Sequence, residues 1–267
     1  VDRIDIVEGA VQKRFIDGDE SGGSIDGTIE LIKKFPDPDN KIRLITGKWE
    51  SKEVIQSKLL EICKTKWMLF IDADEVISKH GMRAVRKFCV NHPNYVYARP
   101  KKFLHFFHDL KHITYSINPL SPWAELGQPH PFLINRDIIA LHFPFHTLPM
   151  DGLGNIIVSD CREYNGKREI LDNVVVFHFG NAKSENDMKQ KLSFEKNRGI
   201  NWTKDSNGSP ELVSENFWFS GKMPKDMIIK KYKGDFPEVM HGHPRIGKEL
   251  IKIIRRKPQY KFKRAGR

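Results

Sequence analysis

The most constraining feature of the sequence is the continuous apolar run Trp67–Ile71, which stops abruptly at the acidic segment Asp72–Glu75. An unbroken apolar run of this length is typical of a β-strand that is buried on both faces, as in parallel sheets covered by helices. It is far shorter than the roughly 20 apolar residues that a membrane-spanning helix needs. The run therefore predicts a central strand of an α/β sheet, with acidic residues where its carboxyl end emerges.

The segments on either side of this run alternate between strand and helix patterns. The predicted strands are Ile4–Val7, Ile42–Ile45 and Trp67–Ile71, and the predicted helices are Ile29–Phe35, Ser51–Cys63 and Lys79–Val90. This rhythm predicts an open, mostly parallel α/β sheet of the Rossmann-like kind, with helices on both faces. The later chain is richer in aromatic residues, His and Pro, and predicts the short strands Tyr95–Ala98, Phe132–Ile134 and Asn173–Phe179 and a helix over Ser184–Gly199.

Basic residues are concentrated at the end of the chain. After His241 there are ten basic residues and one acidic residue, Glu249, whereas the net charge of all 267 residues is +11. A basic arm on a nearly neutral body suits anionic lipid, nucleic acid or another polyanion, and a solubilising terminal helix has the same composition. We therefore predict one domain in two halves, residues 1–95 and 96–240, followed by a basic helical tail, residues 241–267.

Asp72 and Asp74 are the strongest candidates for chemistry. In open α/β sheets, ligands bind beyond the carboxyl ends of the strands, and alternate residues of an extended segment point the same way. Two close carboxylates repel each other unless a cation or hydrogen-bond donors share them, and their oxygens suit Mg²⁺ or Mn²⁺. The alternative interpretation is an acidic first turn of the helix that follows.

A glycine-rich loop, Gly22–Thr28, precedes the first predicted helix. Its glycines allow the backbone to approach a ligand closely, and Ser24 or Asp26 can cap the helix. A purely structural turn has the same pattern, so the loop alone does not separate the two interpretations.

Taken together, the strand before Glu8, the turn Gly23–Thr28 and the strand ending at Asp72–Glu75 resemble the nucleotide-sugar half of a family 2 glycosyltransferase. In that family a strand leads to a Ser-Thr-Asp-Gly-Thr turn, and a later strand ends in an Asp-x-Asp metal motif. The resemblance covers residues 1–90. The family's first strand would precede Val1, so the resemblance predicts that this sequence lacks that strand and its nucleotide-contacting loop.

The resemblance implies a GT-A fold, a nucleoside-diphosphate sugar donor, a divalent metal (Mn²⁺ or Mg²⁺) and a glycan or glycolipid acceptor. By analogy, Asp72 would contact the ribose or donor sugar, Asp74 would hold the metal, and Asp26 would lie near the nucleotide. Residues 1–95 would be the nucleotide-sugar-binding half and residues 96–240 the acceptor-side half. Several family branches place a His at a late strand end, as His178 is here, and neutral imidazole is a good Mn²⁺ ligand; a structural His is the alternative.

Inverting members of the family use an Asp or Glu to deprotonate the acceptor hydroxyl. Family spacing places this base at Asp151, with His146 and Glu125 as rivals, and a turn aspartate before Gly152 as the structural alternative. The pairs His105/His108 and His241/His243 have neither the HExxH pattern nor an obvious third ligand, so we interpret them as structural.

The three cysteines stand apart from one another, with no CxxC pair and no signal peptide pattern, which predicts a soluble protein of a reducing compartment such as the cytoplasm. The tail would allow peripheral contact with the inner membrane face. The leading function is a metal-dependent, inverting glycosyltransferase of hexose or a related sugar. The alternative is a non-catalytic protein that binds sugar nucleotides, nucleic acid or another polyanion.

Overall fold

A computed structural model describes residues 1–9, 22–24, 26–50, 52–116, 133–137, 167–184, 186–189 and 227–241. The chain groups into two compact units. The first unit comprises Val1–Asp72, His80–Lys101 and Pro129–Val174, and the second comprises Ala73–Lys79, Lys102–Gln128 and Val175–Arg267. Both of the segments predicted as halves, residues 1–95 and 96–240, contribute to each unit.

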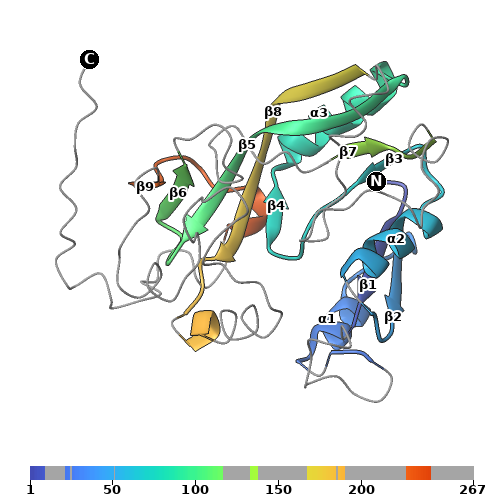
Figure 1. Ribbon diagram of the computed structural model, residues 1–267, viewed down its shortest axis with the longest axis horizontal. Helices are drawn as coiled ribbons and strands as arrows, with labels where there is room; N and C mark the ends of the chain where they lie inside the picture. The colour runs from blue at the N-terminus through green and yellow to red at the C-terminus, as the bar shows by residue number, and fades with distance from the viewer. Residues whose placement is uncertain are drawn as a thin grey trace. The chain divides into compact units, whose positions relative to one another are not determined.

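The first unit begins with a two-stranded parallel sheet made of β1 (Ile4–Glu8) and β2 (Ile42–Thr46). The helix α1 (Thr28–Lys34) lies between these strands in sequence, and α2 (Lys52–Ile62) follows β2 (Figure 1). This strand–helix–strand–helix order confirms the prediction for this part of the chain, and the bounds of β1, β2 and α2 agree with the predicted ranges to within one or two residues.

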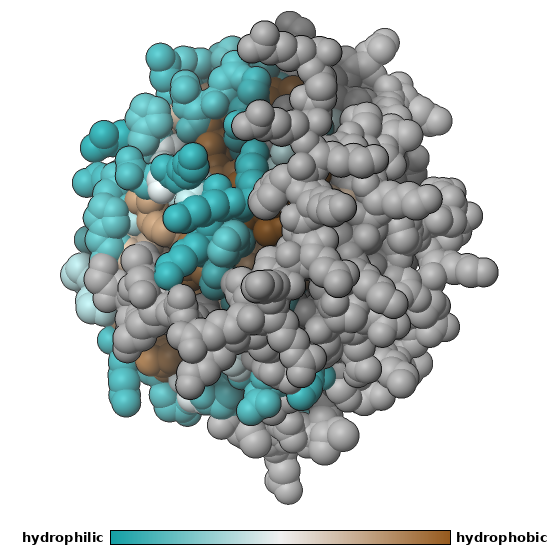
Figure 2. All heavy atoms as spheres, turned by 90° about the vertical axis from the view of Figure 1, so that its left-hand side faces the viewer, coloured by the Kyte–Doolittle hydropathy of each residue, from teal (hydrophilic) through white to brown (hydrophobic). Residues whose placement is uncertain are grey.

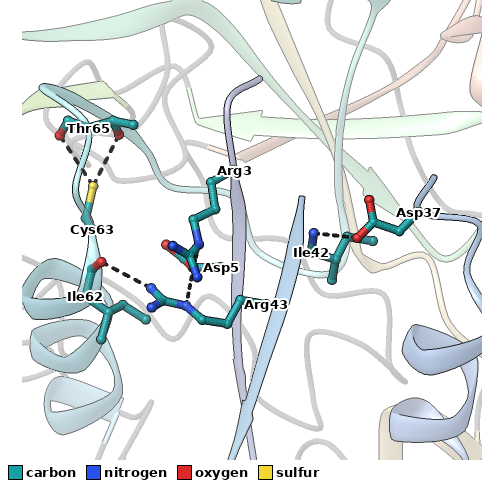
Figure 3. A network of polar contacts seen from close by, with 8 residues as sticks. All are labelled: Arg3, Asp5, Asp37, Ile42, Arg43, Ile62, Cys63 and Thr65. Carbon is teal, nitrogen blue, oxygen red and sulfur yellow. Dashed lines mark hydrogen bonds and ion pairs between the residues drawn. The ribbon is translucent and has the colours of Figure 1, made fainter. Parts of the chain in front are cut away.

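An ionic network joins the small sheet to the end of α2 (Figure 3). The carboxylate of Asp5 on β1 accepts a hydrogen bond from Nε of Arg43 on β2 at 2.7 Å and lies 3.0 Å from Nε of Arg3. Nη2 of Arg43 also donates to the carbonyl oxygen of Ile62 at 3.1 Å. The last carbonyls of a helix lack partners within the helix, so this guanidinium both satisfies the end of α2 and ties it to β2.

The helix α1 differs from its prediction. Its expected apolar face is not buried: Leu31 is 72% exposed and Phe35, which follows the helix, is 63% exposed. The start of the helix is defined by a glycine N-cap and a hydrogen bond from its first amide. Gly27 occupies the N-cap position with φ of 88°, and the carboxylate of Asp26 accepts a hydrogen bond from the Thr28 amide at 3.0 Å.

The rest of the first unit is antiparallel and carries its core. β3 (Trp67–Leu69) pairs with β7 (Leu133–Asn135), which pairs in turn with β5 (Tyr95–Phe107). Phe88 of α3 (Lys79–Asn91) packs edge-on against Trp67 and Tyr95, with ring centroids 5.5 and 5.4 Å apart. Burying each such side chain contributes about 1.5–3 kcal/mol. The core residues of this unit include Leu60, Val85, Phe88, Val96, Leu133 and Ile134.

The second unit also contains paired strands. β4 (Glu75–Ile77) pairs with β8 (Lys167–Asn181), and β6 (His112–Ser116) pairs with β5 and with β9 (Met227–Lys231); a 3-10 helix, η3 (Glu238–Met240), follows. Figure 1 shows the long strands β5 and β8 side by side, as their pairing requires. An aromatic cluster forms the core, with Phe106, Leu110, Ile113, Phe177 and Ala182 at its centre.

Among the strand pairs of the described residues whose direction is established, only β1 and β2 show the predicted parallel pairing. The pairings β3–β7, β5–β7, β5–β6, β6–β9 and β4–β8 are antiparallel. The reason is visible at β5 and β6, which a four-residue connection joins, because so short a link allows only antiparallel pairing. β3 is also shorter than predicted: it ends at Leu69, its residues are half-buried, and Ile71 is 45% exposed because the chain turns at Ala73 and Asp74.

Polar side chains cover most of the described surface on the face drawn in Figure 2, and apolar residues show between them. Within the described part of the chain, no helix has the length and hydropathy needed to cross a membrane. Cys63 and Cys89 are free thiols, and Cys161 lies outside the described residues.

Candidate active site

Asp74 is held at the point where the chain enters β4. Ala73 and Asp74 form a turn, and the carbonyl oxygen of Asp74 accepts a hydrogen bond from the amide of Phe179 on β8 at 2.8 Å. The next residue, Glu75, is the register partner of His178. Antiparallel pairing of β4 with β8 therefore fixes the backbone of Asp74 beside the strand that carries His178.

The side chains of Asp74 and His178 approach each other. Oδ1 of Asp74 lies 3.6 Å from Nε2 of His178, and the two side chains are 38% and 17% exposed. This separation is longer than a good hydrogen bond. It is close to the spacing of two ligands on one cation, because ligand atoms about 2.1 Å from an octahedral ion lie about 3 Å apart.

Gly180 allows the side chains of Asp74 and His178 to lie against the backbone of β8. A Cβ at this position would lie 2.6 Å from Oδ2 of Asp74 and 2.7 Å from Nε2 of His178. Any larger residue would therefore push these side chains away. The absence of a side chain at residue 180 therefore lets the carboxylate and the imidazole both lie beside this residue.

His105 stands behind His178. Its Nδ1 lies 3.0 Å from Nδ1 of His178, and the two rings meet nearly edge-on with centroids 4.9 Å apart. His105 is only 2% exposed and stacks on Phe103 of the same strand at 5.3 Å. This neighbour was not predicted, because His105 had been interpreted as structural and the sequence does not reveal that β5 lies beside β8.

The donor set fits a divalent cation in part. One carboxylate oxygen and one imidazole nitrogen suit Mn²⁺, which accepts both ligand types. Among the described residues, no group of three or more His, Cys, Asp or Glu side chains gathers around one point. Asp74 and His178 would thus hold such an ion as a pair, leaving its other positions to oxygen atoms of water or of a phosphate.

Asp72 and Asp26 belong to the first unit, whereas Asp74 and His178 belong to the second. Asp72 is exposed. The expectation that Asp72 and Asp74 face one site assumed an extended backbone, but the chain turns at Ala73 and Asp74. Their joint action on one ligand stays a prediction.

Asp26 has a defined local role. Its hydrogen bonds with the side chain and backbone of Thr28 lower the pKa of its carboxyl group below the usual value, so the group is ionised at neutral pH. The negative charge lies at the start of α1, where the helix dipole favours it. Its contact with a nucleotide stays a prediction.

The carboxyl ends of β1 and β2 meet at a cluster of glycines. Gly9 and Gly22 adopt φ of 138° and 88°, and a Cβ on Gly9 would collide with the carbonyl oxygen of Gly47. Glu8, which the sequence analysis did not select, accepts a hydrogen bond from the amide of Ser24 at 3.2 Å. An acidic residue at the end of a predicted strand was the available signal for it.

The turn between β5 and β6 holds a second group of ionisable side chains. Oδ1 of Asp109 accepts hydrogen bonds from the amides of Lys111 at 2.7 Å and His112 at 2.8 Å. Burial would raise the pKa of Asp109, but its hydrogen bonds outweigh that effect and the pKa is lowered. Burial also lowers the pKa of His108 to about 3. The hydrogen bonds of Asp109 hold the turn, and the structural role of His108 stays a prediction.

Asp151, its rivals His146 and Glu125, and the basic tail beyond His241 lie outside the described residues. The assignment of Asp151 as a base and of the tail as a membrane or polyanion contact stay predictions.

Comparison with known proteins supplies the family. Residues 21–151 match the family described as Glycosyl transferase family 2, a segment that contains Asp26, Asp72, Asp74 and Asp151. No curated protein matches the chain. The family implies a GT-A α/β fold, a nucleotide-sugar donor and an acceptor substrate. From this match, together with the strand–helix order of β1 to α2 and the acidic turn after β3, we conclude that residues 21–151 form a region of the glycosyl transferase family 2 type, which supports glycosyltransferase activity in general.

Proposed function

We propose that this glycosyltransferase moves a sugar from a nucleoside-diphosphate sugar to a hydroxyl group of a glycan or glycolipid, with inversion and with a divalent cation at Asp74 and His178. The observation that carries the proposal is the 3.6 Å approach of Oδ1 of Asp74 to Nε2 of His178. The glycine at position 180 supports it, because a larger residue there would collide with both of these side chains.

The bound cation would offset the negative charge that grows on the departing diphosphate, which is the usual contribution of a metal to this class of reaction. Asp74 would hold the ion through a carboxylate oxygen and His178 through Nε2 of its ring. Asp72 would hold the ribose or the donor sugar, and Asp26 would lie near the nucleotide.

In the proposed reaction, the acceptor oxygen attacks the anomeric carbon on the face opposite the diphosphate. The bond between that carbon and the phosphate oxygen breaks, and its electron pair leaves with the diphosphate. The proton of the acceptor hydroxyl passes to the carboxylate of Asp151, which acts as general base. Attack from the opposite face inverts the configuration at the anomeric carbon.

The test is sugar-nucleotide hydrolysis and transfer, assayed over a panel of donors with Mn²⁺ and with EDTA. Asp74→Asn removes the charged ligand and is expected to lower metal-dependent turnover at least about 100-fold, because losing a ligand costs no less than losing its supporting neighbours. Asp39→Asn is the matched control, since Asp39 forms an exposed ion pair with Lys41. Equal activity of wild type with Mn²⁺ and with EDTA, or full activity of Asp74→Asn, would contradict the proposal.

A further inference from the structure

His105, His178 and Asp74 form a chain of three side chains within the second unit. Nδ1 of His178 faces Nδ1 of His105 at 3.0 Å, and Nε2 of His178 faces Oδ1 of Asp74 at 3.6 Å. The two ring nitrogens of His178 therefore point to different neighbours. Whether Nδ1 of His105 donates or accepts this hydrogen bond therefore determines whether Nε2 of His178 carries a proton or a free lone pair.

Two neutral imidazoles share a single proton at a contact of this kind, because one Nδ1 must donate and the other must accept. If His105 donates, the proton of His178 is on Nε2, which then cannot bind a metal. If His178 donates, its Nε2 carries a lone pair directed to the space beside Asp74. Histidine ligands commonly donate their second N–H to a fixed acceptor in this way.

We propose that His105 is a positioning residue that accepts the Nδ1–H of His178 and so keeps Nε2 of His178 available to a divalent cation. The inference rests on the proposed function, since it concerns the same cation. It adds a residue from β5 to a site whose ligands come from β8 and the turn before β4.

The surroundings of His105 suit such a role. The ring is 2% exposed, so water does not compete for its Nδ1. The ring stacks on Phe103 of the same strand. A buried ring that packs on a neighbouring ring presents its acceptor atom in a defined orientation, which is what an orienting partner requires.

The experiment measures Mn²⁺ binding directly by electron paramagnetic resonance of the free ion, with no donor present. His105→Phe keeps a buried aromatic ring but removes the acceptor, whereas His105→Asn retains an acceptor oxygen near the position of Nδ1. Thr114→Val is the matched control, because it changes a buried polar residue opposite His105 while keeping its shape. Thermal unfolding of each variant checks that it folds.

We expect His105→Phe to weaken Mn²⁺ binding about 10- to 100-fold, His105→Asn to recover much of that loss, and Thr114→Val to bind as wild type does. His178→Ala separates the two proposals. If His178→Ala abolishes binding while His105→Phe does not weaken it, the inference about His105 is wrong and the metal site stands. If His178→Ala binds Mn²⁺ normally, the metal site of the proposed function is wrong.

The wild-type protein gives a second readout that does not depend on any variant. In ¹⁵N spectra recorded with diamagnetic Zn²⁺ as the probe, His178 should show a metal-bound Nε2 and a protonated Nδ1. A metal-bound Nδ1, or a proton on Nε2 in the presence of saturating Zn²⁺, would overturn the assignment of His105 as the acceptor.

Discussion

Glycine is central both to the carboxyl end of β1 and to the end of β8, but it does opposite things in the two places. At the end of β1, Gly9 and Gly22 let backbone segments pack closely, and the carboxylate of Glu8 accepts a hydrogen bond from the Ser24 amide. Near the end of β8, Gly180 accommodates two polar side chains, whose nearest atoms Oδ1 of Asp74 and Nε2 of His178 are 3.6 Å apart. In the first region the glycines let backbone pack on backbone, and in the second the glycine lets two candidate ligand side chains lie against the strand.

The largest effect is expected in the first region. Gly9→Ala places a Cβ against the carbonyl oxygen of Gly47, and the φ of 138° at residue 9 is strained for any residue with a side chain. Because the colliding atom belongs to the backbone, it cannot move aside without a large cost. We expect the substitution to lower the free energy of unfolding by about 3 kcal/mol or more, as measured by urea denaturation followed by circular dichroism. A loss under about 1 kcal/mol would mean that this glycine cluster is not closely packed.

The second effect concerns the second unit and is a loss of stability at acidic pH. The folded pKa of His108 is lowered to about 3 by burial, against an ordinary value of 6.5. Between these values the unfolded chain binds the extra proton, so the stability contributed by the neutral ring is complete above pH 6.5 and falls as the pH drops toward 3. At pH 5 the expected loss is about 2 kcal/mol.

The check on this loss is the unfolding free energy of wild type and His108→Asn at pH 7 and pH 5. Asn tolerates the left-handed backbone at this position, where φ is 64°, and it does not titrate. We expect a smaller decline with pH in the variant than in wild type. Parallel declines would show that another group is responsible.

The third prediction uses the same Gly→Ala substitution as the first but expects a different outcome. In Gly180→Ala, the three heavy atoms nearest to the new Cβ belong to the Asp74 and His178 side chains. We expect its free energy of unfolding to stay within about 0.5 kcal/mol of wild type. Its Mn²⁺ affinity should fall about tenfold, because both ligands must move aside as they would if a supporting neighbour were lost. Unchanged Mn²⁺ affinity would end the distinction between the two glycine regions.

The smallest effect is at the start of α1. Asp26→Ala removes the acceptor for the Thr28 amide and a favourable charge at the helix start, which should cost about 0.5–1 kcal/mol of stability. The loss should disappear as the pH falls below the ordinary carboxyl value of 3.8, since the lowered pKa of Asp26 makes its contribution depend on ionisation. An effect that is constant with pH would point to packing alone.

Local patterns in the sequence predicted β1, β2, α2 and α3 well, because hydrophobic period and helix-ending prolines are local signals. They did not predict that β5 extends to Phe107, or that it pairs with β6, β7 and β8, because strand pairing depends on residues far apart in the sequence. The same limit explains the site. Asp74 and His178 were selected individually as metal ligands, whereas His105 needed knowledge of the β5–β8 pairing.

The single hydrogen atom that serves as the side chain of residue 180 gives a simple marker for reading relatives of this chain. A related sequence that keeps the aspartate and the histidine but places a branched residue two positions after the histidine would have its would-be ligands forced apart. If the cation of the proposed function binds at these two residues, such a sequence would retain the fold without it, and the residue at this position would distinguish relatives that can use a metal from those that cannot.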